Sequence, residues 1–238
     1  MNNVPQPKQS VIDLYLPDRD TGKTVVPKLP ADWVDWFLGA QIAKTRVQKG
    51  KNIGHSLPAL AFVAATGATP IEIASGIKIK VSSADEIAIL IGGSTLPEKK
   101  ALQPRILVFN RNNHVNLAVD YLINSYCRPQ TVGRTYVFTY KQDRLSKLVN
   151  DLAKEFIEKK IPNRQREGIR ISSSTFRHQI SADLCASGRY EAIEIASILG
   201  LRKTSSLRGY ALKSKSTARS LRTVECYVPK KTLETGGV

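Results

Sequence analysis

The sequence predicts an α+β fold that is mainly helical and contains one small three-stranded antiparallel sheet. Three observations lead to this prediction: helical patterns begin after residue 30, three strand patterns follow between residues 77 and 110, and helical patterns return after residue 114. Strands that are grouped together, and do not alternate with helices, are typical of segregated α+β domains. The chain of 238 residues is long enough for one such domain with an extension.

Three helices are expected before the sheet. The first two cover residues 31–48 and 56–67. The sequence ATPIEIASG then predicts a short helix, with Thr69 as its N-cap and Pro70 at its first position. Glu72 follows Thr69 at the spacing of a capping box, so the start of this helix is defined by its own residues.

The three strands are expected over residues 77–81, 86–93 and 104–110. They are short segments rich in isoleucine, valine and leucine, as half-buried strands are. The loop between the second and third strands carries two lysines, Lys99 and Lys100.

Four helices are expected after the sheet. One covers residues 114–127, and the next has an apolar stripe at helical spacing from Leu145 to Phe156. The last two cover residues 173–187 and 190–199, each closed by a glycine. Near the end of the chain, residues 223–229 resemble a strand.

The chain is expected to divide into three parts. Residues 1–30 contain five prolines and are predicted to form an extended arm. Residues 31–215 form the folded domain, and residues 216–238 form a basic C-terminal tail.

The composition favours a polyanionic partner. The formal net charge is +16, which makes double-stranded DNA the first expectation. The longest apolar run, residues 57–68, is shorter than the roughly 20 residues that cross a bilayer. No signal peptide pattern opens the sequence, so no membrane partner and a cytoplasmic location are expected. No small-molecule substrate is expected either.

The cysteines and histidines do not form a metal-binding pattern. No C-x-x-C pair exists, and the six residues are widely spaced: Cys127, Cys185, Cys226, His55, His114 and His178. Neither a zinc site, nor a disulfide framework, nor any other cofactor is expected.

Three segments carry a resemblance to a known family. ATGATPIEIASG (65–76) resembles the Thr-Gly-x-Arg-x-x-Glu box of tyrosine recombinases, the phage-type integrases. STFRHQISADL (174–184) resembles their second box, in which an arginine precedes a histidine on a helix. LGLRKTSSLRGY (199–210) is similar to their third box, where Leu-Gly-His is followed nine residues later by the nucleophilic tyrosine. The resemblance covers roughly residues 31–215 and implies that family's catalytic-domain fold.

The resemblance also implies roles for individual residues. In a working member, Tyr210 would attack the phosphodiester and Arg177 would hold the non-bridging oxygens. His178 would assist the tyrosine, and Lys100 on the hairpin loop would protonate the leaving oxygen. These four residues are the expected catalytic set if the chain is active.

The chain departs from the family pattern at three positions. Thr69 stands where the first box has its arginine, and Leu201 stands where the third box has its histidine. Ser174 replaces the variable histidine of the second box. Threonine cannot supply the positive charge that is missing at the first position, and leucine cannot donate the hydrogen bond that is missing at the second.

These departures favour a DNA-binding protein on a recombinase fold with weak or no strand transfer. It would act as a regulator or an architectural factor, for which a mobile genetic element is one setting. The expected DNA-binding residues are Arg177, Arg202, Lys203, Arg208, Lys99, Lys213 and Lys215.

Two other functions stay open at the level of sequence. The first is an active integrase in which Arg202 or Arg166 replaces a missing donor. The second is a basic protein-interaction module that does not bind DNA. In either DNA-binding case, the C-terminal tail could join two copies of the chain.

Overall fold

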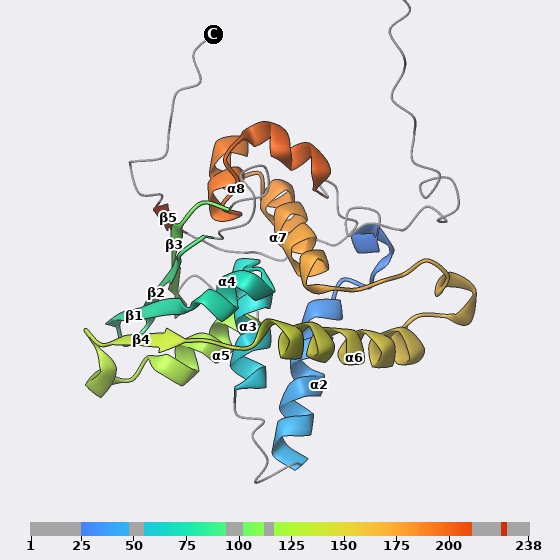
Figure 1. The fold of residues 1–238 in the computed structure, drawn as a ribbon, viewed down its shortest axis with the longest axis horizontal. Helices are drawn as coiled ribbons and strands as arrows, with labels where there is room; N and C mark the ends of the chain where they lie inside the picture. Colours follow the sequence, from blue (N-terminus) through green and yellow to red (C-terminus); the bar gives the residue numbers. More distant parts are fainter. Residues whose placement is uncertain (1–24, 48–54, 94–101, 112–116, 211–224, 228–238) are drawn as a thin grey trace, which may run out of the picture.

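The computed structural model describes residues 25–47, 55–93, 102–111, 117–210 and 225–227 (Figure 1). Its α-helices are α2 (Trp33–Val47), α3 (Ser56–Thr66), α4 (Pro70–Ser75), α5 (Leu117–Tyr126), α6 (Gln142–Lys160), α7 (Ser173–Ser187) and α8 (Ala192–Ile198). Its strands are β1 (Ile77–Ser83), β2 (Glu86–Ile91), β3 (Arg105–Asn110), β4 (Thr135–Phe138) and β5 (Glu225–Tyr227). Four short 3-10 helices are also described: η2 (Val26–Lys28), η5 (Pro129–Thr131), η6 (Asn163–Gln165) and η7 (Thr204–Gly209). The fold is α+β and mainly helical, as the sequence predicts.

The strands form one antiparallel sheet in the order β4-β1-β2-β3-β5. Its three central strands are the predicted ones, but the predicted total of three is wrong. The four-residue strand β4 pairs with the outer edge of β1 and adds a fourth strand. At the opposite edge, three residues of the strand-like tail segment pair with β3 as β5. The sheet therefore has four strands of four to seven residues and a short fifth strand.

Alternating side chains give the sheet one buried face. In β1, Ile77 and Ile79 are buried whereas Lys78 is exposed. Strand β3 follows the same alternation, which buries Leu107 and also, two residues earlier, the charged side chain of Arg105. The inner face of the sheet thus contains one arginine.

The helices pack around α3, which is buried on all of its sides (Figure 1). An aromatic cluster joins α2, α6 and α7. The ring centroids of Trp33 and Phe176 are 4.6 Å apart, and those of Phe37 and Phe156 are 5.6 Å apart. The Trp33 indole N–H donates to the side-chain oxygen of Gln179 at 2.8 Å, so this cluster also fixes the rotation of α7.

The folded body begins before residue 31. Val25 and Val26 are buried, and Val26 packs against Ala182 of α7. The last residues of the predicted 1–30 arm therefore belong to the core, while residues 1–24 lie outside the described part of the chain. Most of the predicted 216–238 tail lies outside it as well.

Candidate functional site

The structure brings together three residues that the sequence analysis selected. Arg177 and His178 lie on α7, and Tyr210 follows directly on η7. The Arg177 Nε–H donates to the Tyr210 hydroxyl oxygen at 2.9 Å, across 33 residues of chain. The rings of His178 and Tyr210 lie 4.8 Å apart, with 38° between their planes. The second and third boxes therefore meet in one site.

The Arg177 guanidinium caps the C-terminal ends of two helices. One Nη donates to the carbonyl oxygen of Gly67, the C-cap of α3, at 3.1 Å. The other donates to the carbonyl oxygen of Leu199, the C-cap of α8. Helix C-termini carry partial negative charge and unsatisfied carbonyls, so a guanidinium stabilises both ends. Arg177 is only 4% exposed, which shows that the structure uses most of its donors internally.

A buried carboxylate links Arg177 to a second arginine. Glu72 of α4 accepts from Arg105 at 2.6 Å and lies 3.8 Å from Arg177. Burial by itself would raise the pKa of the Glu72 carboxyl, but Arg105 and then Arg177 outweigh burial and hold that pKa below its usual value. For Arg177, burial lowers the pKa, and the nearby charge of Arg105 lowers it further. Arg105, Glu72 and Arg177 form a cluster that we call the buried charge triad.

Thr69 has the capping role that the sequence predicts. Its hydroxyl accepts from the Glu72 backbone N–H at 3.4 Å, and its own backbone N–H donates to Glu72 Oε2 at 2.8 Å. The capping box is therefore confirmed. The position of the first-box arginine is thus occupied by a neutral helix cap, and the Glu72 carboxylate serves both this cap and the triad.

The Leu-Gly-Leu turn of the third box packs against Arg105. Gly200 has a φ of 66°, and its carbonyl oxygen accepts from the Gln103 N–H at 2.8 Å. A Cβ at Gly200 would lie 2.6 Å from an Nη of Arg105 and 2.9 Å from the Gln103 carbonyl oxygen. Glycine is therefore required here for close approach as well as for its backbone conformation. Leu201, the next residue, is partly buried and packs against the core.

We expect Gly200→Ala to lower the free energy of unfolding by about 2 kcal/mol or more, because it combines a positive φ with a steric clash. Gly39→Ala is the matched control. Gly39 lies within α2, and a Cβ there would meet nothing within 4 Å. Alanine at that position should leave stability unchanged or raise it by about 0.5–1 kcal/mol. Urea unfolding of both variants measures the difference, and equal effects would contradict the packing described for Gly200.

The other predicted site residues fall into three groups. Arg202, Lys203 and Arg208 are exposed on the turn around η7. Ser174 is exposed on the first turn of α7, where its hydroxyl hydrogen bonds with that of Ser172. Four lysines lie outside the described residues, and the structure does not place them: Lys99, Lys100, Lys213 and Lys215.

Arg166, considered as a replacement donor, has a different position. It donates to the carbonyl oxygens of Glu158 and Ile161. These contacts hold its guanidinium at the C-terminal end of α6. These contacts are structural and involve none of the three box residues.

Arg105 is the site residue that the sequence analysis missed. It was expected only as part of the third strand. A usable signal exists, because the period of two that buries Leu107 and Phe109 also points Arg105 inward. An arginine on a core-facing position requires a buried partner of opposite charge, but sequence spacing alone does not identify that partner as Glu72.

Comparisons with known proteins leave the family unassigned: no family model, curated protein or solved structure matches the chain. In the described ranges, no three His, Cys, Asp or Glu side chains gather as a metal site would require. Nor is any helix of the described residues long and apolar enough to cross a membrane. The resemblance to tyrosine recombinases therefore depends on the three sequence boxes and on the site they form.

Proposed function

We propose that this chain is a DNA-binding protein built on a tyrosine-recombinase catalytic-domain-like fold and impaired in strand transfer. It would regulate or organise DNA, and a mobile genetic element is a suitable setting. The observation that carries the proposal is the meeting of Arg177, His178 and Tyr210, which come from two separate boxes of the sequence.

The chemistry of strand cleavage explains why activity should be low. The Tyr210 oxygen would have to bond to phosphorus while the bond from phosphorus to the 5′ oxygen breaks. The transition state then needs positive groups on the non-bridging oxygens and a proton for the leaving oxygen. Thr69 supplies no charge and Leu201 supplies no hydrogen bond. Loss of one such donor typically costs about 10²–10³ in rate.

The hydrogen bonds that Arg177 makes inside the protein also support low strand-transfer activity. Its Nη groups donate to two helix ends, and its Nε–H donates to Tyr210. A guanidinium bound in this way stabilises the site but has few donors left to form a fork around a phosphate. Arg202 and Lys203 are exposed on the turn that leads into η7, where they could contact the DNA backbone.

We expect double-stranded DNA binding that weakens steeply as salt rises. Each phosphate neutralised by a lysine or arginine adds about 0.9 to the slope of log affinity against log salt. Replacing Arg202, Lys203 and Arg208 together by alanine should weaken binding to duplexes of any sequence and reduce this slope. Fluorescence anisotropy over a series of salt concentrations measures both quantities.

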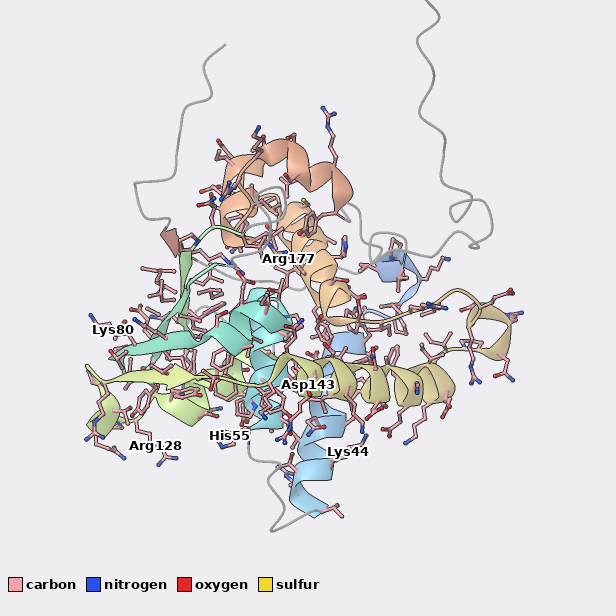
Figure 2. All side chains as sticks on the ribbon, viewed as in Figure 1. Lys44, His55, Lys80, Arg128, Asp143 and Arg177 are labelled. Carbon is pink, nitrogen blue, oxygen red and sulfur yellow. The ribbon has the colours of Figure 1, made fainter. Side chains whose placement is uncertain are left out.

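A matched control uses cations on another part of the molecule. Lys78 and Lys80 are exposed on β1. Figure 2 shows Lys80 on the sheet, well apart from Arg177. Replacement of Lys78 and Lys80 should change the slope less than the η7 variant does. A flat salt response of the wild type would contradict DNA binding, and an unaffected η7 variant would move the binding face elsewhere.

An active integrase is the second candidate function. The Tyr210 hydroxyl lies beside both a guanidinium and an imidazole ring, as a nucleophile would. A covalent 3′-phosphotyrosyl adduct distinguishes this function from the first. A basic protein-interaction module would show neither the adduct nor salt-dependent DNA binding.

We also propose a cytoplasmic location and self-association of the chain. A cytoplasmic location agrees with Cys127 and Cys185, which are free thiols. Self-association through residues 216–238 is proposed from the family resemblance. Sedimentation of the full chain and of a chain ending at residue 215 tests it.

A further inference from the structure

The site contains a buried cation that no box of the sequence supplies. Arg105 enters from β3 with an exposed fraction of 0%, and both of its Nη atoms face Glu72, at 2.6 and 3.5 Å. The Nε of Arg105 has no hydrogen-bond acceptor among the described residues. One carboxylate therefore serves two guanidinium groups.

The charges of the buried triad do not cancel. Two arginines and one glutamate carry a net charge of +1, and the ion pairs that the described residues give them are with one another. Charge inside a protein is costly unless a partner compensates for it. The excess is adjacent to Tyr210, because Arg177 donates to the hydroxyl of this tyrosine. The site is thus suited to an anion at this hydroxyl.

We propose that Arg105 replaces the positive charge that is missing at Thr69, and that it does so from behind Glu72, as a positioning residue of a binding site for one phosphodiester anion. Arg105 does not touch the ligand, since it is fully buried. Arg105 neutralises the negative charge of Glu72. Glu72 therefore does not cancel the positive charge of Arg177, which lies beside the Tyr210 hydroxyl. This inference rests on the proposed DNA-binding function and adds the ligand chemistry of the site.

The geometry favours a phosphodiester over other anions. A diester carries one negative charge, which matches the excess charge of the triad. The Tyr210 hydroxyl accepts from Arg177 and can donate its own proton to a phosphate oxygen. Arg202 and Lys203 are exposed on the turn that leads to Tyr210, so neighbouring phosphates of a DNA strand would find cations there.

Three variants separate charge from structure. Arg105→Met leaves the triad neutral, Glu72→Gln leaves two positive charges, and the double variant restores the wild-type charge. Arg105→Met should bind duplex DNA about tenfold more weakly than the wild type. The double variant should bind with an affinity close to that of the wild type, and Glu72→Gln should bind no more weakly than the wild type. Stability should follow a different order, because all three variants lose a buried ion pair.

Arg105→Lys is a more conservative variant, for use if Arg105→Met does not fold. It keeps the charge and loses the two-pronged contact, so affinity should fall by less than about threefold. A structural role for Arg105 would instead make affinity follow stability in every variant. That result, or a double variant as weak as Arg105→Met, would overturn the proposal.

The surface offers a matched control for each change. Lys44 and Lys159 pair with Glu155 at 2.6 and 2.8 Å, which forms a partly solvent-accessible arrangement with the same signs of charge. Lys44 and Arg177 are far apart on the molecule (Figure 2). Lys44→Met and Glu155→Gln repeat the charge changes of Arg105→Met and Glu72→Gln, and should shift affinity by less than about twofold.

Inorganic phosphate provides a test that does not depend on DNA. Phosphate should raise the melting temperature of the wild type more than that of Arg105→Met. If the wild type binds no duplex, the proposed function fails, and the phosphate response still decides whether the triad holds an anion. An equal or absent response in the two proteins would overturn the inference.

Discussion

Arg177→Met should lower the free energy of unfolding by about 3–5 kcal/mol. The change removes the buried donor that satisfies the carbonyls of Gly67 and Leu199 and that also meets Glu72 and Tyr210. Two helix ends then lose their cap in a place that water does not reach. Urea unfolding followed by circular dichroism measures the loss.

Arg202→Met is the control for this prediction. Arg202 carries the same charge but is exposed, so its loss should change stability by less than about 0.5 kcal/mol. A drop of less than about 1 kcal/mol for Arg177→Met would show that the guanidinium does not hold the two helices. Duplex binding of the Arg177 variant should be compared only at temperatures where it remains folded.

Covalent adduct formation should be slower than in a complete recombinase site by about four powers of ten or more. The site lacks a charge at Thr69 and a hydrogen-bond donor at Leu201, although such losses are not strictly additive. A pool of nicked duplexes with random sequence, incubated with the protein and separated on a denaturing gel, measures the adduct. Tyr210→Phe is the blank, since it keeps the ring and removes the attacking oxygen.

Restoring the missing groups tests the same prediction from the opposite direction. Thr69→Arg together with Leu201→His should raise adduct formation above the Tyr210→Phe blank. The structure adds a cost, because Thr69 and Glu72 form a capping box whose loss is worth about 1 kcal/mol. Stability must therefore be measured beside activity. An adduct formed readily by the wild type would end the proposal of impaired strand transfer.

The parts of the fold that depend on neighbouring residues could be predicted from the sequence. The capping box at Thr69 and Glu72 uses contacts three residues apart, and the structure confirms it. Helix α7 has the predicted bounds, because its cap and its closing glycine are both local. Strand β4 was missed for the opposite reason. It has four residues, Val137 among them is 67% exposed, and its pairing with β1 is a long-range contact.

The candidate site could be predicted only in outline. The resemblance of the boxes selected Arg177, His178 and Tyr210, and the structure places them together. The resemblance did not show that Arg177 would be buried, because the carbonyl groups that accept from Arg177 lie 110 and 22 residues away in the sequence. Arg105 lies outside the boxes, and its partner Glu72 is 33 residues away. Such contacts are set by how the chain folds back on itself and leave no local pattern.

The capping of α3 by Arg177 has a consequence for the order in which the chain acquires its structure. The carbonyl of Gly67 receives its donor from a residue 110 positions later, and α8 ends later still. During synthesis, α3 and strands β1 to β4 therefore leave the ribosome before the residue that caps α3. Contacts of such long range slow folding, because loop closure must come first. The site can form only after α7, α8 and Tyr210 have been synthesised, so we expect its contacts to be among the last that the chain makes.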